Sequence, residues 1–554
     1  MTLIQELRSH PDPERTLALL QRLAATAKGP QGLFKLHEQL LFYKAYPRSK
    51  AIRQFCEAEL NRFAERVWAL DGDQREALAQ TGIAGTRIYY PYDESMASFL
   101  MGRLGAKVEI DWEAYAERED DPLSDYLAPL TELAEGDAVD DPEVTAQRFI
   151  EAARGPSHTT SLSWVLDAFT RAFHLPARRQ IYNAMNLSLV MELAPEGPSR
   201  TLLDDGPPPT LFIWDPEKAR ARFDLIPEVR RPLRLPEPVP PARGKVLLEL
   251  AWGTLLPRLR ELYPAIHGNP AEVYDVALER GIRMILWFVE PAFRLPLDAD
   301  WGLLILKNHV PIGYGAGGML ADRSEIAINV FDTFRGGEAA WLYSQLARML
   351  NGICHAPWLV TRRYQVGYEN DEGLGSGSFW FYDKLGFRSV DPEIRKLADQ
   401  ERAQIAKHKG YRSPRRVLKK LSAADVVLSL KGEPAEAYRE FPISDAGLAA
   451  TRMIAVEFGG DRHDLEHRVL NRLKQQFGIS YQGWSAAEKS WFAQMGLFVL
   501  AVPDVNHWPT RDKVALFNLC RLKGSPREAD YARAFRENRK FFEKLRAVCI
   551  PAVS

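Results

Sequence analysis

Glu325-Ile-Ala-Ile-Asn-Val-Phe-Asp-Thr-Phe-Arg-Gly-Gly-Glu-Ala-Ala-Trp341 is the stretch that decides the expected fold of this chain. Residues 325–331 predict a strand, and the pattern of residues 338–350 predicts a helix. The turn between them contains two glycines. A strand that runs into such a turn and then a helix offers free backbone N–H groups and the positive end of the helix dipole. This arrangement can hold a pyrophosphate group.

The segments on both sides of this stretch alternate between strand and helix patterns. Strand-like runs occupy residues 302–306, 310–316, 359–367 and 387–390. Helical patterns occupy residues 246–262, 271–286 and 378–384. The sequence therefore predicts an α/β (α+β) domain over residues 244–395, with a mixed sheet at its centre.

The rest of the chain has a different character. Residues 1–195 repeat apolar side chains at helical spacing, apart from a β-leaning segment at 85–93, and predict a mainly helical N-terminal domain. Residues 196–243 are rich in proline, which disfavours helix interiors and central strands, and predict an extended linker. Residues 396–554 return to helical patterns and predict a helical C-terminal domain.

Composition narrows the class of protein. The 554 residues include 72 Lys and Arg against 73 Asp and Glu, a net charge of −1, which argues against a dedicated nucleic-acid binder. The four cysteines are scattered and form no Cys-x-x-Cys pair, so we expect a reducing, cytoplasmic environment. No apolar run reaches the length of a membrane-spanning helix, and the first residues predict no secretory signal.

Three further motifs have competing interpretations. Gly313-Tyr-Gly-Ala-Gly-Gly318 fits G-x-G-x-x-G, but a strand follows it rather than a helix, which favours a hairpin over a dinucleotide site. His463-Asp-Leu-Glu-His467 fits H-x-x-E-H, with Glu543 as a third conceivable metal ligand, although its charged neighbours favour a solvated helix face. Residues 402–420 carry eight Lys or Arg and no acid, typical of an exposed surface or a phosphate-binding stripe.

Phe381-Tyr-Asp-Lys-Leu-Gly-Phe387 predicts a short helix that ends at Gly386 before another strand. This element resembles the closing "FYxKLGF" string of the GNAT superfamily, the CoA-dependent N-acyltransferases. The strand, turn and helix that begin at Glu325 resemble the acyl-CoA pyrophosphate loop of the same superfamily. The resemblance covers about 100–150 residues. It implies a GNAT-like central domain between the two helical domains, with acyl-CoA or CoA as co-substrate, or an acyl-carrier protein as donor.

The resemblance also implies roles for particular residues. Tyr382 is the candidate general acid, Glu325 the candidate base and Asp332 the second candidate base. The residues that would contact CoA are Arg335, Gly336, Gly337, Ala339, Ala340 and Asn370.

Two departures from the superfamily pattern set the alternatives. Glu338 stands where the loop of the superfamily has its first glycine, and Asn370 lies twelve residues before Tyr382 rather than about seven. The first hypothesis is an N-acyltransferase that acts on an amine whose identity the sequence does not give. The alternative is a GNAT-fold protein that has lost catalysis and serves as a binding or scaffold module. A third, weaker hypothesis is an RNA-modifying acyltransferase that contacts RNA through residues 402–420.

Overall fold

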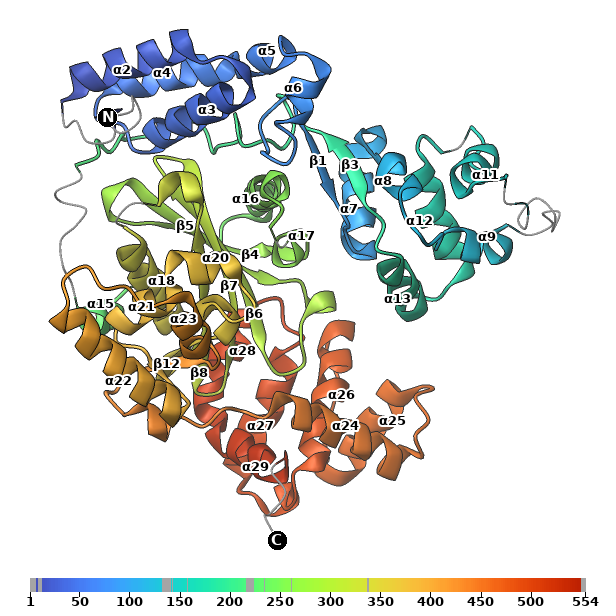
Figure 1. Cartoon of the computed structure of the whole chain (residues 1–554). Helices are drawn as coiled ribbons and strands as arrows, with labels where there is room; N and C mark the ends of the chain where they lie inside the picture. Colours follow the sequence, from blue (N-terminus) through green and yellow to red (C-terminus); the bar gives the residue numbers. More distant parts are fainter. Residues whose placement is uncertain are drawn as a thin grey trace. The chain divides into compact units, whose positions relative to one another are not determined.

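A computed structural model gives the fold of the chain (Figure 1). It describes residues 6–7, 12–131, 141, 143–156, 158–215, 224–233, 235–260, 262–335 and 338–549. The chain forms two compact units, and each is built from separate stretches of sequence. The first unit comprises Met1–Trp214, Leu248–Ile266 and Lys307–Pro311, and the second comprises Asp215–Leu247, His267–Leu306 and Ile312–Ser554. Residues 196–243 are therefore shared between the two units.

The first unit begins with three packed helices, as the sequence predicted: α2 (Pro13–Thr26), α3 (Gly29–Ala45) and α4 (Lys50–Asn61). The side chain of Asp12 accepts from two backbone N–H groups of the first turn of α2, and that of Ser49 accepts from Ile52 N in α4. Their apolar faces form a core in which Leu20, Leu36 and Leu40 are completely buried.

A small antiparallel sheet follows in the first unit. Its strand order is β1 (Arg87–Tyr90), β3 (Leu189–Glu192), β2 (Val108–Ile110), and β1 lies within the segment predicted as β-leaning. Arg87 pairs with Glu192 across β1 and β3. The other helices of this unit are α5 (Phe63–Trp68), α6 (Gly72–Glu76), α7 (Glu94–Leu104), α8 (Trp112–Ala116), α9 (Ser124–Leu130), α11 (Ala146–Ala153), α12 (Ser161–Ala172), α13 (Leu175–Met185) and α17 (Tyr263–Ile266), while α16 (Pro241–Leu255) runs from one unit into the other.

The second unit is built around a mixed sheet. Its order is β11-β12-β10-β8-β7-β6-β5-β4, and β9 pairs with β7 beside β8. The strands are β4 (Gly268–Ala277), β5 (Ile282–Val289), β6 (Ala299–Lys307), β7 (Val310–Leu320), β8 (Arg323–Glu325), β9 (Ala327–Val330), β10 (Trp358–Thr361), β11 (Arg388–Ser389) and β12 (Val426–Ser429). Strands β8 and β10 run parallel, while β4/β5, β7/β8, β7/β9, β10/β12 and β11/β12 run antiparallel. The prediction of a mixed α/β architecture with a central mixed sheet is confirmed.

The prediction of a helix over residues 271–286 is wrong, because these residues form most of the β4–β5 hairpin. Arg280 and Gly281 have φ of 62° and 68°, which turns the chain between the two strands. Strand β5 is buried on both faces apart from Arg283, and an unbroken apolar run does not distinguish a central strand from a buried helix. The apolar spacing of residues 271–286 therefore suggested a helical periodicity where the structure has two strands.

The β8–β9 segment is interrupted at one residue. Both strands pair with β7 in one register, which places Met319 opposite Ser324 and Ala316 opposite Ala327. Between them, Ile326 belongs to neither strand. On the other side, β8 pairs with β10 and Ile326 N donates to Val360 O at 2.9 Å, whereas the pairing of β9 within the described part of the chain is with β7 alone. The sheet therefore opens between β9 and β10 beyond Ile326.

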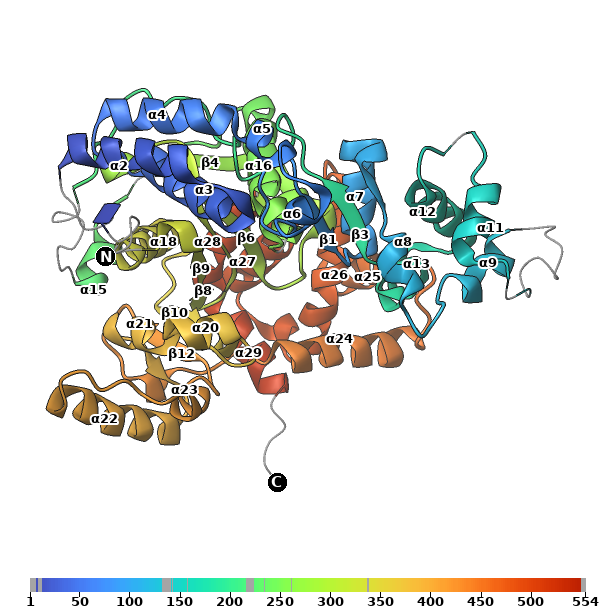
Figure 2. The ribbon, with the colours of Figure 1, turned by 45° about the horizontal axis from the view of Figure 1, so that its top comes forward.

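Helix α18 (Ala339–Cys354) connects β9 to β10 and packs against α15 (Leu225–Arg230) and α28 (Glu528–Ala534). After β10 come α19 (Arg363–Val366), α20 (Asp371–Ser376) and α21 (Ser378–Lys384). The remaining helices are α22 (Pro392–Lys407), α23 (Arg415–Leu421), α24 (Ile443–Phe458), α25 (Leu465–Phe477), α26 (Ala486–Ala501), α27 (Thr510–Leu522) and α29 (Arg539–Cys549). Helix α26 packs against α24, α25, α27 and α29, and these helices gather together in both views (Figures 1 and 2).

A buried ion network fixes the C-terminal helices to the sheet. The guanidinium of Arg294 donates to Lys523 O and Ser525 O at 2.7 Å, where α27 ends, and lies 3.2 Å from the carboxylate of Glu528. Glu272 on β4 accepts from the N–H groups of Glu528 and Ala529 at 2.7 and 2.8 Å, at the start of α28. The side chains of Arg294, Glu272, Lys523 and Glu528 have no exposed surface, so the network is part of the core.

Candidate functional site

The opening of the sheet beyond Ile326 has two different sides. Trp358 and Val360 of β10 pack against Tyr438, which follows η6 (Ala435–Ala437). Because side chains alternate along a strand, Thr361 points to the opposite side, toward α18 and α21. We call the side of Thr361 the helical side and the side of Val360 the charged side.

Tyr382 lies on the helical side, within α21. Its ring is buried and meets Tyr343 of α18 at 5.9 Å and Phe387 at 5.7 Å between ring centroids. Burial raises the pKa of Tyr382 well above its usual value, and a hydrogen bond with Thr361 offsets part of this rise. The hydroxyl therefore stays protonated at ordinary pH and is suited to donate a hydrogen bond at the opening.

The "FYxKLGF" string forms the predicted short helix and its end. Helix α21 stops at Lys384, and Gly386 has a φ of 98° that other residues rarely adopt. Phe387 N then donates to Tyr382 O at 3.1 Å, which closes the helix end. The string thereby fixes the position of Tyr382 between α18 and β10.

Glu325 lies on the charged side, at the end of β8, and two arginines hold its carboxylate. Arg362 Nε lies at 2.7 Å and Arg323 Nη1 at 3.2 Å. The Glu325 side chain is 28% exposed, so it remains within reach of solvent. This carboxylate therefore already has two guanidinium partners.

The two arginines also gather three further carboxylates. Arg362 Nη1 lies 2.8 Å from Asp425 and 3.1 Å from Glu440, and Arg323 Nη2 lies 3.3 Å from Asp298. We call this set of six the charged cluster: Asp298, Arg323, Glu325, Arg362, Asp425 and Glu440. The cluster has four acids and two bases. Apart from Glu325, sequence analysis missed these residues, since their partners lie far apart along the chain.

Asp300 on β6 is a further carboxyl group that the sequence analysis missed. It makes no hydrogen bond or ion pair with any residue that the structure describes. Burial raises its pKa to about 7, with smaller contributions from the nearby carboxylates of Asp298, Glu528 and Glu325 and an opposing one from Lys523. Such a group changes protonation near neutral pH, as a general base requires. The spacing of Asp298 and Asp300 at the start of a strand is the one sequence signal that places both on one face.

Gly318 of β7 lies beside these carboxyl groups, and its neighbour Gly317 faces the backbone of β8. A Cβ atom at Gly318 would lie 3.3 Å from Asp298 Oδ1 and 3.4 Å from Asp300 Oδ1. At Gly317 a Cβ atom would lie only 2.1 Å from Glu325 O, so glycine is required for β7 to approach β8 this closely. The predicted hairpin interpretation of the glycine-rich stretch is confirmed, because it lies within β7 and opens no helix.

The predicted CoA loop precedes α18. Arg335 donates to Val330 O at 3.0 Å and pairs with Asp332 at 2.5 Å and with Glu372. Asp332 itself is 72% exposed and lies in η5 (Asp332–Phe334). Gly336 and Gly337 lie outside the described residues. Arg335 and Asp332, which are three residues apart in the sequence, therefore form an ion pair.

The first turn of α18 contains Ala339 and Ala340. Glu338 precedes it and is buried, and its carboxylate lies 3.9 Å from Arg280. The Glu338 side chain makes no capping hydrogen bond to the N–H groups of this turn. Asn370 caps α20 instead, accepting from Gly373 N and donating to Tyr364 O, both at 3.0 Å.

The other candidate motifs lie mostly at the surface or in ion pairs. No group of three or more His, Cys, Asp or Glu among the described residues could hold a metal ion, and His463 is largely exposed. In the basic stretch, Arg402 pairs with Asp383 and Asp399, and Arg415 pairs with Asp371. The four cysteines are all buried as free thiols.

Comparison with protein-family models, with curated proteins and with solved structures finds no match to this chain. Within the described ranges, no helix is both long enough and apolar enough to cross a membrane.

Proposed function

We propose that the second unit is an N-acyltransferase of the GNAT type, which moves an acyl group from acyl-CoA or an acyl-carrier thioester to an amine. The observation that carries the proposal is the opening of the sheet between β9 and β10, with α18 following β9 and Tyr382 beside Thr361. An extended thioester arm would find a free backbone edge there, because β9 has no strand partner on the side of β10 among the described residues.

The two sides of the opening suggest separate binding sites for the thioester donor and the amine acceptor. The donor enters from the helical side, where the positive end of the α18 dipole attracts phosphate. The amine approaches from the charged side, where the excess of carboxylates attracts an ammonium group. Asp300 takes the proton from this ammonium, and Glu325 with its two arginines positions the amine.

Acyl transfer to the amine follows. The neutral amine nitrogen attacks the thioester carbonyl and the C–N bond forms. The nitrogen gives its remaining excess proton to solvent, the C–S bond breaks, and the sulfur leaves as a thiolate. Tyr382 donates a hydrogen bond to this sulfur. Because burial places the pKa of Tyr382 above that of a thiol, full proton transfer from it is not favoured, and the thiolate takes its proton from solvent.

The second candidate function is a binding or scaffold module without catalysis. It is favoured by Arg335, whose guanidinium is already neutralised by Asp332 and Glu372 and would have to exchange these partners for a phosphate. We also propose a reducing, cytoplasmic compartment, in keeping with four free buried thiols.

A thermal-shift titration with CoA, acetyl-CoA and a long-chain acyl-CoA tests the proposal. A ligand at 100 times its dissociation constant stabilises by about 2.7 kcal/mol. Arg335→Ala should weaken CoA binding by about 1–3 kcal/mol, while Lys396→Ala on the exposed face of α22 should leave it unchanged. Binding with no release of free CoA thiol, across a panel of amines, would favour the scaffold. Absence of any shift, combined with no transfer from acyl-carrier protein, would contradict the proposal.

A further inference from the structure

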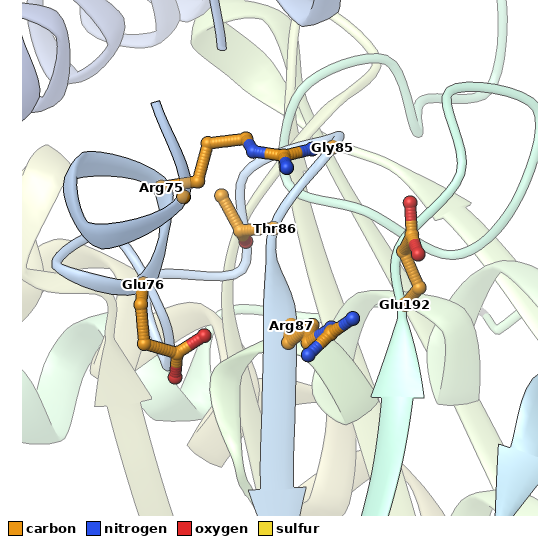
Figure 3. Close-up of a pocket in the computed structure, with 7 residues that line it drawn as sticks. Arg75, Glu76, Gly85, Thr86, Arg87 and Glu192 are labelled. Atoms are coloured by element: carbon orange, nitrogen blue, oxygen red, sulfur yellow. The ribbon is translucent and has the colours of Figure 1, made fainter. Parts of the chain in front are cut away.

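The first unit contains a small polar pocket that none of the roles above uses. It has a volume of about 280 Å³ and lies between α6, the loop before β1, and the strands β1 and β3 (Figure 3). Its lining residues are Gly72, Arg75, Glu76, Gly85, Thr86, Arg87 and Glu192. This volume is near the lower end of small-molecule sites, so the pocket suits a single small metabolite.

Two of the four charged groups in the pocket are already engaged with one tyrosine. Tyr89 on β1 forms side-chain hydrogen bonds with both Arg87 and Glu76. The bond to Tyr89 raises the pKa of Arg87, and the neighbouring carboxylates of Glu192 and Glu76 raise it further. Arg87 and Glu76 are therefore linked through the Tyr89 hydroxyl.

The other two charged groups are available. Neither the Arg75 guanidinium nor the Glu192 carboxylate forms an ion pair or a hydrogen bond with any described residue. Arg75 projects from α6 toward Gly85, and Glu192 stands on β3, on the far side of β1 from α6 (Figure 3). Arg75 and Glu192, a cation and an anion that form no ion pair or hydrogen bond with the described residues, thus border the same small space, and Arg87 lies beside Glu192 on the neighbouring strand.

We propose that this pocket binds a free α-amino acid, with its carboxylate on Arg75 and its ammonium on Glu192. A ligand that is only an anion would meet the carboxylates of Glu76 and Glu192, and a ligand that is only a cation would meet the two arginines. A zwitterion satisfies both free groups at once. The planar guanidinium of Arg75 can hold a carboxylate through two parallel hydrogen bonds.

The backbone keeps the pocket open. A Cβ atom at Gly72 would meet no other atom within 4 Å, so this wall faces free space. Gly85 has a φ of 86°, and a Cβ atom there would lie 3.0 Å from Trp68 Nε1. A side chain at Gly85 would therefore both strain the loop and push against the tryptophan.

The test is a thermal-shift screen of the full chain with each proteinogenic L-amino acid at millimolar concentration. Isothermal titration then compares the best amino acid with its decarboxylated amine and its deaminated acid. We expect the amino acid to bind and each half-analogue to bind about 10- to 100-fold more weakly, the loss that one charge-assisted contact represents. Absence of binding by every amino acid, or equal binding by a half-analogue, would overturn the proposal.

Variants then assign the two ends of the ligand. Arg75→Ala and Glu192→Gln should each weaken binding about 10- to 100-fold. Both residues are exposed, so folding should be preserved. Arg22→Ala and Glu113→Gln make the same charge changes at exposed positions of the same unit and should leave binding unchanged. Binding that survives both pocket substitutions would place the amino acid elsewhere and refute the assignment.

Discussion

Replacing Arg294 by methionine should destabilise the second unit more than any exposed substitution does. The arginine is fully buried and donates to the carbonyl oxygens of Val289, Lys523 and Ser525, and it faces the carboxylates of Glu272 and Glu528. Methionine fills much of the space but donates to none of these oxygens. Removing one partner of a buried ion pair costs about 3–5 kcal/mol, and unsatisfied carbonyl groups add to this cost.

We therefore expect Arg294→Met to lose about 4 kcal/mol or more, a large part of the 5–15 kcal/mol that is typical of a domain. With a urea m-value of about 3 kcal/mol/M, the midpoint of unfolding falls by about 1.3 M. Urea titration followed by tryptophan fluorescence measures this shift. Hydrogen exchange should show that the backbone amides of Glu528 and Ala529, which donate hydrogen bonds to the Glu272 carboxylate, lose protection first.

Arg533→Met is the matched control, since Arg533 forms an exposed pair with Asp530 of the kind that contributes about 0–1 kcal/mol. If Arg294→Met costs no more than this control, the network does not hold the C-terminal helices to the sheet and the reasoning fails.

Four further predictions concern three variants at or beside the opening of the sheet. The acylation rate of the unchanged protein should rise through about pH 7, because the base must be deprotonated, and Asp300→Asn should remove this rise. A pH–rate profile of the variant that keeps the inflection would exclude Asp300 as the base. The raised pKa also means that the carboxyl of Asp300 favours the folded state below about pH 4 and loses this effect as pH rises through 7, so unfolding of the variant should be less pH-dependent over this range. Tyr382→Phe should reduce turnover roughly 10²-fold or more with little change in CoA affinity, and unchanged turnover in a folded variant would count against the hydrogen bond to sulfur. Gly317→Ala should lower the melting temperature by several degrees, because its Cβ would lie 2.1 Å from Glu325 O, whereas Gly447→Ala in the exposed face of α24 should not.

Local signals predicted the segments around the opening well. The prediction of a strand over residues 359–367 is wrong beyond Thr361, because α19 follows β10 there. Strand β9 forms within the predicted strand 325–331, after an interruption at Ile326, and the helix α18 and the short helix that carries Tyr382 form where the residue pattern placed them. Each depends on periodicity, a turn or a capping residue within a few positions. The same signals failed for residues 271–286, where an apolar run fits both a helix and a buried hairpin.

The charged cluster could not be predicted in the same way. Arg362 meets Asp425 and Glu440, which lie more than sixty residues further along the chain, and the pairing depends on β12 returning beside β10. Asp300 could not be predicted either: its spacing from Asp298 places both on one face, but nothing near it in the sequence indicates that this half-buried carboxyl group has a raised pKa. Whether Tyr382, Glu325 and Arg335 act as the resemblance implies stays a prediction.

The tip of the β6–β7 hairpin has a consequence for how this chain reaches its native state during synthesis. Asn308 donates to Ala45 O and Phe212 O and accepts from Phe212 N, each at 2.9 Å, while Arg53 donates to Asn308 O. These bonds tie together parts of the first unit, yet the ribosome makes Asn308 almost a hundred residues after Phe212. During synthesis, the N-terminal helices therefore lack their hydrogen bonds to Asn308 until the β6–β7 hairpin has left the ribosome. A nascent chain halted before residue 307 should be cut by protease within the first unit, and one halted well beyond residue 311 should resist.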